Sequence, residues 1–173
     1  MDDRSSKKRL ETLNGTRGWL IESLRSHLVP VFIERGFSIA PIATHNEPVD
    51  RELLSMLPLG RLCRPTSEGV DLVEIELASR GRAEFRISAG VAPKAGLMTP
   101  TGHWAAEELL VGWLGESYEM YSSPWWRSWF SVRSRGAPPT KNDYEKLIVE
   151  VAGLSRNSSP PFAAVSWDRI CDV

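Results

Sequence analysis

Two neighbouring stretches decide the fold of this chain: DLVEIELA, from Asp71 to Ala78, and AEFRISAGV, from Ala83 to Val91. Apolar and polar side chains alternate in both, which is the period of a β-strand with one face against a core. The face expected to be buried carries Val73, Ile75, Leu77, Phe85, Ile87 and Ala89. Because Gly81 lies between the stretches, we expect an antiparallel hairpin whose other face is in water.

The length of the hairpin loop sets which residues pair, because a shift of one residue turns every side chain to the other face. A loop from Arg80 to Arg82 pairs Glu76 with Arg86, whereas a loop from Ser79 to Gly81 leaves Glu76 opposite a second glutamate. The second loop places glycine third, where a three-residue loop needs a left-handed residue. A non-glycine residue there costs about 1–2 kcal/mol, more than an exposed Glu–Glu contact. The sequence therefore predicts the loop Ser79–Gly81, with Gly81 at positive φ.

Apolar residues at spacings of three and four predict a helix before the hairpin and another after it. The two series are Leu20, Leu24, Leu28, Val31 and Phe32, and Tyr144, Leu147, Ile148, Val151 and Leu154. Thr16 is expected to cap the first helix, Pro30 to kink or split it, and Gly36 with Phe37 to end it. A third, short helix is expected around Val49 to Leu57.

The remaining elements complete an α+β fold. Further strands are expected over Leu59–Arg64, Tyr118–Tyr121 and Trp125–Val132, and a helix over Trp104–Leu114 with Thr101 as its cap. The fold class is thus a mainly antiparallel meander of about five strands packed against an N-terminal and a C-terminal helix. Residues 1–15 are expected to be a flexible leader, 16–157 a single domain, and 158–173 an apolar tail packed on it.

Composition excludes several classes of protein. The chain has 173 residues, 42% hydrophobic and 25% charged, with a net charge of −1. Nucleic acid is therefore an unlikely partner, because a phosphate-binding surface needs a basic excess. There is no membrane-spanning apolar run and no apolar secretory signal at the start, so we expect a soluble, cytoplasmic protein. Two distant cysteines, Cys63 and Cys171, give neither a disulfide scaffold nor a zinc ribbon.

Three phrases follow an opening helix that ends in Gly-Phe: GRLCR at Gly60–Arg64, EGVDLVEI at Glu68–Ile75 and FRISAGV at Phe85–Val91. Over about residues 20–92 this succession resembles the bacterial domain of unknown function 4304 family, in which such a helix precedes a meander. The resemblance implies a fold rather than an activity. Some helix-plus-meander proteins of this size are immunity partners of bacterial toxins, which favours protein binding by analogy.

Motifs of catalysis are missing from the sequence. It contains neither a Gly-x-Ser-x-Gly elbow nor a Gly-Lys-Ser/Thr phosphate loop. His103 and Glu107 are four residues apart in a predicted helix, which would place two metal ligands on one face, but no third ligand has suitable spacing. We therefore expect no metal and no cofactor. Cys63 is expected to be a buried thiol rather than a nucleophile.

Tryptophan is the most unusual feature of the composition, with seven in the chain and three in WWRSWF, from Trp125 to Phe130. In a strand Trp125, Arg127 and Trp129 share one face, and Phe130 lies on the other, as part of the core. Two indoles flanking a guanidinium, with Arg133 nearby, suit stacking, cation–π contacts or a protein partner. The alternative is that the C-terminal tail or a helix covers these indoles.

Two hypotheses of function follow. The first is a non-enzymatic protein-interaction module, immunity- or regulator-like, that binds through Trp125, Arg127, Trp129 and Arg133. The second is a small-molecule-binding protein or enzyme with a groove between the sheet and a helix. Its candidate polar groups are His103, Glu107, Glu108 and Arg127. A flat aromatic face would favour the first hypothesis, and a pocket with converging polar groups the second.

Overall fold

The computed structural model describes residues 15–40, 42, 47–79, 81–100, 102–120, 128–132 and 136–157. The strands are β1 (Ser38–Ala40), β2 (Arg61–Pro65), β3 (Gly69–Leu77), β4 (Glu84–Pro93), β5 (Leu97–Thr99), β6 (Gly102–Trp104), β7 (Ser117–Glu119) and β8 (Phe130–Ser131). The helical segments are residues 15–23, η1 (Leu24–Leu28), α2 (Val29–Ile33), α3 (Glu47–Met56), η2 (Ala106–Glu108), η3 (Val111–Trp113) and α4 (Lys141–Asn157). None of these described helices is long and apolar enough to cross a membrane.

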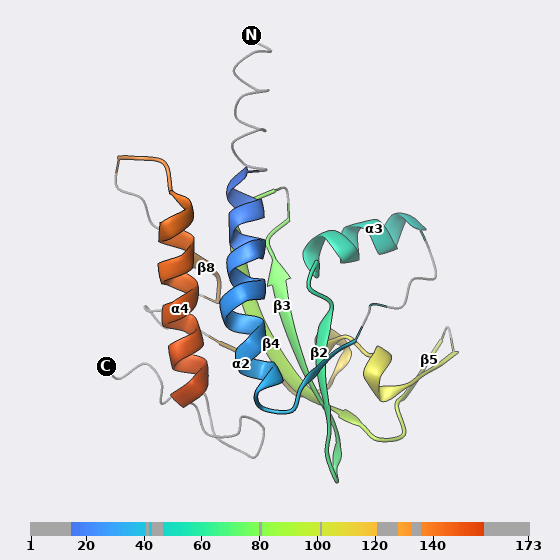
Figure 1. Ribbon diagram of the computed structural model, residues 1–173. Helices are drawn as coiled ribbons and strands as arrows, with labels where there is room; N and C mark the ends of the chain where they lie inside the picture. The colour runs from blue at the N-terminus through green and yellow to red at the C-terminus, as the bar shows by residue number, and fades with distance from the viewer. Residues whose placement is uncertain are drawn as a thin grey trace.

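A mainly antiparallel sheet forms the centre of an α+β fold, as predicted (Figure 1). Its six strands follow the order β1-β2-β3-β4-β7, and β8 also pairs with β4. β5 and β6 form a separate two-stranded sheet. The sequence predicted neither β1 nor the β5–β6 pair. A strand was also expected over Trp125–Val132; in the described part of that segment, residues 128–132, only β8 is a strand.

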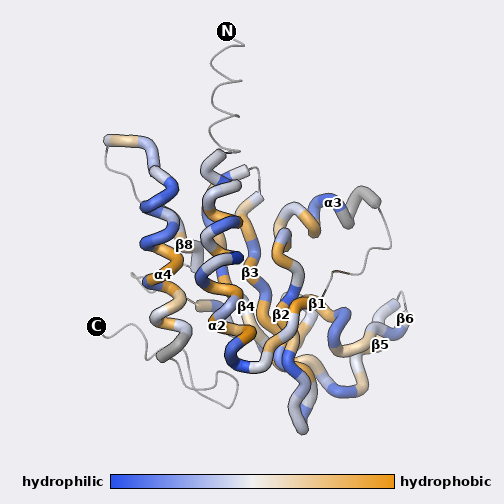
Figure 2. The backbone as a smooth tube through the Cα atoms, in the orientation of Figure 1, coloured by the Kyte–Doolittle hydropathy of each residue, from blue (hydrophilic) through white to orange (hydrophobic). Residues whose placement is uncertain are grey.

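One face of the sheet is covered by residues 15–33 and α4, which lie side by side across it (Figure 1). All six hairpin side chains expected inside are buried in this main core: Val73, Ile75, Leu77, Phe85, Ile87 and Ala89. Figure 2 shows hydrophobic stretches along the first helix and the strands behind it. The two helices contribute buried side chains to the same core, among them Leu20, Leu24 and Ile148. Alternation and helical spacing therefore predicted this core correctly.

The first helix changes its hydrogen bonding one turn before its proline. The N–H of Val29 donates to the carbonyl of Leu24, five residues back, so residues Leu24–Leu28 form a π-helical turn. Pro30 then lies in the first turn of α2, where its missing N–H is tolerated. Of the predicted kink or split, the split does not occur, because the helix continues through Pro30 without a break. Thr16 is not its cap, because Gly15 is already helical; the Thr16 hydroxyl instead bonds with Tyr144 of α4.

The helix ends in the predicted Schellman motif. Gly36 has φ 84° and donates to the carbonyl of Ile33 at 3.0 Å. The N–H of Phe37 donates to the carbonyl of Phe32 at 3.1 Å, and the two phenyl rings meet edge to face, 5.7 Å apart. This is the six-to-one bond and the apolar contact that define the motif.

The hairpin register differs from the prediction. Glu76 pairs with Arg86 and Leu77 with Phe85, which is the register rejected from the sequence. Gly81 does have positive φ, at 73°. The last hydrogen bond joins the N–H of Ala78 to the carbonyl of Glu84 at 2.9 Å, so the loop is longer than three residues and glycine lies near its middle. The predicted three-residue loop Ser79–Gly81, and the register that follows from it, were therefore wrong.

Long-range contacts explain the longer loop. The guanidinium of Arg17, on the first helix, donates to the carbonyls of Ala78 at 2.7 Å and Arg82 at 3.1 Å, and to that of Ser55 at 2.6 Å. The bonds to Ala78 and Arg82 satisfy carbonyls at the hairpin loop that a tighter turn would pair by itself. The observed register also sets Arg86 against Glu76 at 2.7 Å. Opposite charges across the strands replace the Glu–Glu contact of the predicted register.

The second face of the sheet is covered, although the alternation predicted one face in water. Cys63, Val70, Leu72 and Ala92 form a second core with Ala106, Leu109 and Val111. The helix predicted over Trp104–Leu114 is absent: this segment consists of the end of β6 and the short turns η2 and η3. Its apolar residues pack on the sheet from two brief 3₁₀ turns, so tertiary contacts override the helical pattern.

Candidate functional site

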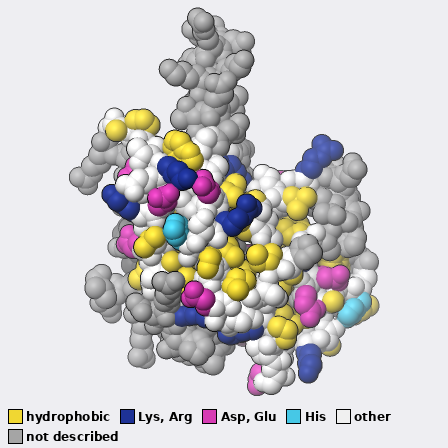
Figure 3. Space-filling model, viewed as in Figure 1, with side chains coloured by type: hydrophobic (Ala, Val, Ile, Leu, Met, Phe, Trp, Pro, Cys, Tyr) yellow, Lys and Arg dark blue, Asp and Glu magenta, His cyan; other side chains and the backbone are white. Residues whose placement is uncertain are grey.

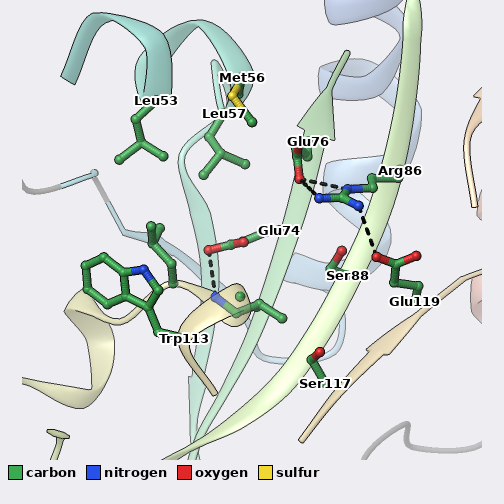
Figure 4. A pocket seen from close by; sticks show the side chains of 13 residues that line it. Leu53, Met56, Leu57, Glu74, Glu76, Arg86, Ser88, Trp113, Ser117 and Glu119 are labelled. Atoms are coloured by element: carbon green, nitrogen blue, oxygen red, sulfur yellow. Dashed lines mark hydrogen bonds and ion pairs between the residues drawn. The ribbon is translucent and has the colours of Figure 1, made fainter. Parts of the chain in front are cut away.

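A cavity of about 320 Å³ lies between α3 and the second face of the sheet. We call it the α3 groove. Side chains from α3, β3, β4, β7 and the η3 region converge on it (Figure 4). The lining residues are Leu53, Met56, Leu57, Glu74, Glu76, Arg86, Ser88, Leu110, Val111, Gly112, Trp113, Ser117 and Glu119. It thus combines an apolar wall with a charged floor.

The apolar wall includes an exposed indole held in place by a second one. Trp113 is 46% exposed and lies at the groove opposite the charged residues (Figure 4). Its ring meets that of Trp104 edge to face, with centroids 5.2 Å apart. Trp104 in turn donates from Nε1 to Oγ1 of Thr99 at 3.1 Å. These contacts orient Trp113 before any ligand arrives.

The charged floor centres on Arg86 of β4. Its Nε donates to Oε2 of Glu76 at 2.8 Å, and Nη1 donates to Oε1 of Glu119 at 3.1 Å. β3 and β7 flank β4, so the antiparallel pairing brings the two carboxylates to either side of the guanidinium. Together with Glu74, the groove has three carboxylate side chains and one guanidinium. With all of these groups ionised, its charge is negative.

Glu74 is a carboxylate in the interior of the second layer. It is 7% exposed, and its Oε1 accepts the N–H of Val111 at 3.0 Å. Burial raises the pKa of Glu74 above its ordinary value, although the bond from Val111 and the nearby charge of Arg61 oppose this shift. The residue therefore fixes η3 over the sheet while it also lines the groove.

Two other polar groups beside the groove are structural. Arg61 is 1% exposed and donates from Nη1 to the carbonyl of Leu109 at 2.9 Å, which fastens the covering segment to β2. Cys63 is buried, as predicted, and burial raises the pKa of its thiol. A thiol held in its protonated form is a poor nucleophile. Neither side chain lines the groove.

Trp129 is the described member of the predicted tryptophan face. It is half-buried, and the guanidinium of Arg86 lies over its ring, with Cζ 5.2 Å from the centroid. Phe130 is buried on the opposite face and stacks on Phe85 at 5.1 Å between centroids. The predicted alternation of these two neighbours is confirmed. Trp125, Arg127 and Arg133 lie outside the described residues, as do residues 1–14 and the tail 158–173.

His103, Glu107 and Glu108 do not line the groove. His103 lies in β6, where Nε2 donates to the carbonyl of Ala95 at 2.6 Å, while Glu107 lies in η2. The predicted sharing of one helical face is therefore wrong. Glu108 accepts the N–H of Ala105 at 3.0 Å and caps η2. Across the residues that the structure describes, no three His, Cys, Asp or Glu side chains form a group that could hold a metal ion.

Sequence reasoning missed most of this site. Glu74, Glu76 and Arg86 carried a signal, since they recur on one face of the hairpin, but they were interpreted as residues in water. Glu119 and Trp113 had no distinguishing pattern. No protein-family model, curated protein or solved structure matches this chain. The resemblance to the domain of unknown function 4304 family therefore stays a prediction.

Proposed function

We propose that this protein is a non-enzymatic small-molecule-binding protein whose site is the α3 groove. The observation that carries the proposal is the cavity of about 320 Å³ between a helix and the sheet. Concave sites with mainly apolar walls and a few convergent polar groups are the usual form of ligand pockets, and this volume is near their lower bound. The second hypothesis from the sequence anticipated such a groove, with different residues.

The chemistry of the lining favours binding over catalysis. Ser88 and Ser117 are the only hydroxyl side chains among the described lining residues, and neither His nor Lys lies there to activate them. The carboxylates that could act as bases are already engaged, by Arg86 or by the N–H of Val111. Nucleophilic catalysis needs a nucleophile beside a base. Arg86 is engaged by carboxylates on both sides. These features support a site that holds a ligand by shape and charge.

A fragment screen by ligand-observed NMR tests the proposal. Ser117 is exposed and lines the groove, so Ser117→Trp should fill the cavity. Ser67→Trp adds the same side chain at an exposed turn away from it and serves as the matched control. We expect fragments that bind the unchanged protein and Ser67→Trp to lose binding in Ser117→Trp. If no fragment is displaced by the groove substitution, the proposal is wrong.

A second candidate is the immunity- or regulator-like interaction module suggested by the tryptophan-rich segment. Trp129 supports it, because this half-buried indole stacks on a guanidinium, a pairing common in protein hot spots. Nucleic acid is disfavoured as partner: acidic and basic side chains are interspersed on the face in Figure 3, without an extended basic area among the described residues of that face. A pull-down with Trp129→Ala as the control tests this candidate. A supporting result is a partner that the unchanged protein captures, that Trp129→Ala does not, and that binds again when purified.

A further inference from the structure

We infer that the α3 groove takes an organic cation: a small molecule that carries a protonated amine on a flat apolar group. This inference rests on the proposed function and adds the chemical class of the ligand. It follows from the charge of the groove, the position of Glu74 and the exposed ring of Trp113.

The charge of the groove selects a cation. Arg86, the guanidinium among the described lining residues, is bracketed by Glu76 at 2.7 Å and Glu119 at 3.1 Å. A ligand anion would have to displace one of these carboxylates to reach it. With Glu74 added, carboxylates outnumber guanidinium groups three to one among the lining residues, and three to two when the buried Arg61 near Glu74 is included. A cationic ligand offsets this excess, whereas an anionic ligand increases it.

Glu74 marks where the cationic nitrogen binds. In Figure 4 its carboxylate lies between the apolar wall and the Arg86 cluster. The bond from the N–H of Val111 to Oε1 at 3.0 Å holds the carboxylate in one orientation. Glu74 is 7% exposed, so a charge-assisted bond from an amine would form where water screens it weakly. The ion pair would also favour the charged form of a carboxylate that burial disfavours.

The apolar part of the ligand has a matching surface. Leu53 and Met56 of α3 line one side of the groove, and Trp113 lines another (Figure 4). Trp113 is 46% exposed although Trp104 holds it in place. A flat ring placed against this indole would remove apolar area from water without first ordering the side chain. A cavity of about 320 Å³ suits a single or fused ring with a short amine chain.

Three indoles with different side-chain ends provide the test: tryptamine with an ammonium, tryptophol with a hydroxyl and indole-3-acetate with a carboxylate. Isothermal titration calorimetry near neutral pH and physiological salt measures each affinity. We expect tryptamine to bind about ten- to hundredfold more tightly than tryptophol, the range of one charge-assisted hydrogen bond, and indole-3-acetate to bind most weakly.

Glu74→Gln tests the position of the amine. Glutamine keeps one oxygen to accept the N–H of Val111, removes the negative charge and replaces the second oxygen by an NH2 group. We expect it to abolish the preference for tryptamine and leave tryptophol binding unchanged. Glu107→Gln removes an exposed carboxylate outside the groove and should keep the preference. If Glu74→Gln fails to fold, Glu119→Gln, on the other side of Arg86, is a second groove variant. It should lower the affinity for tryptamine.

Each other outcome has a definite meaning. If the three indoles bind equally and Ser117→Trp displaces them, the groove is a binding site and the inference of a cationic ligand is wrong. If none binds, or if Glu74→Gln and Glu119→Gln both keep the preference for tryptamine, the inference is overturned as well. The fragment screen then decides independently whether the groove binds neutral or anionic molecules.

Discussion

The guanidinium of Arg86 lies over the indole ring of Trp129, with Cζ 5.2 Å from the ring centroid. The same guanidinium pairs with Glu76 and Glu119, so one side chain of β4 links β3, β7 and the residue before β8. Trp129 therefore lies next to the α3 groove but does not line it. The α3 groove and Trp129, the described member of the predicted tryptophan face, therefore meet at Arg86.

Trp129 and its neighbour Phe130 should respond very differently to truncation. Phe130 is 4% exposed and stacks on Phe85, so Phe130→Ala should lower the free energy of unfolding by about 3–5 kcal/mol. Trp129 is half-buried on the other face, where the cation–π contact contributes about 0.5–1 kcal/mol at exposed sites. Urea denaturation measures both. A loss for Trp129→Ala as large as for Phe130→Ala would place the indole in a second core.

The cross-strand pair of Glu76 and Arg86 should be measurable by a double-mutant cycle. Arg86 side-chain exposure is 31% and that of Glu76 is 13%, so solvent screens the pair in part. We expect Glu76→Gln and Arg86→Gln to show a coupling of about 0.5–1 kcal/mol in unfolding, reduced in about 1 M salt. The Arg82–Glu84 pair, at 3.4 Å and more exposed, is the matched comparison and should couple less. Equal couplings would mean that the groove pair gains nothing from its burial.

Glu74 should make stability depend on pH. Burial raises its folded pKa above the ordinary 4.5, so the folded state binds the proton more tightly than the unfolded chain. This contribution to stability is complete below pH 4.5 and is lost as pH rises through the folded pKa. Relative to Glu74→Gln, the unchanged protein should therefore become less stable as the pH rises above 4.5. Urea denaturation at several pH values checks the trend.

The comparison for that experiment is Glu107→Gln, which removes the charge of an exposed residue outside the groove. If the stability of the unchanged protein relative to Glu74→Gln stays constant across this range, or increases with pH, Glu74 is not destabilised by burial.

The end of the first helix provides a stability prediction away from the site. Gly36 has φ 84°, where a side chain is strained, so Gly36→Ala should cost about 1–2 kcal/mol. Gly18 is exposed in the helix, and an added Cβ would meet nothing within 4 Å. Gly18→Ala should therefore stabilise the protein by up to about 1 kcal/mol. Thermal melts of the two variants should shift in opposite directions, and shifts of the same sign would contradict the assignment of Gly36.

Local patterns were sufficient for the main core. The alternation in Asp71–Ala78 and Ala83–Val91 identified the six side chains that the hairpin buries, and the Gly36-Phe37 pair identified the end of the first helix. The position of Trp129 opposite Phe130 followed from the same alternation. These features depend on a period of two or 3.6 residues and on backbone preferences, which a short stretch of chain carries by itself.

The site could not be predicted in this way, because its residues come from α3, β3, β4, η3 and β7. Glu74 was recognised as a charged residue on the second face, but its burial depends on Val111, which lies 37 positions away. The groove forms only when α3 and the segment that contains η3 pack over the sheet. No local pattern specifies that second layer, and η3 even departs from the predicted helix.

The sequence by itself determined which faces of the strands and helices are apolar, because side-chain direction follows backbone geometry at each residue. Only the tertiary structure decided the hairpin register, since the carbonyls of its loop are satisfied by Arg17, 61 positions from Ala78. It likewise decided that the second face is covered rather than wet. Both outcomes depend on which distant groups satisfy buried polar atoms and cover apolar surface, and these groups become neighbours only when the whole chain has folded.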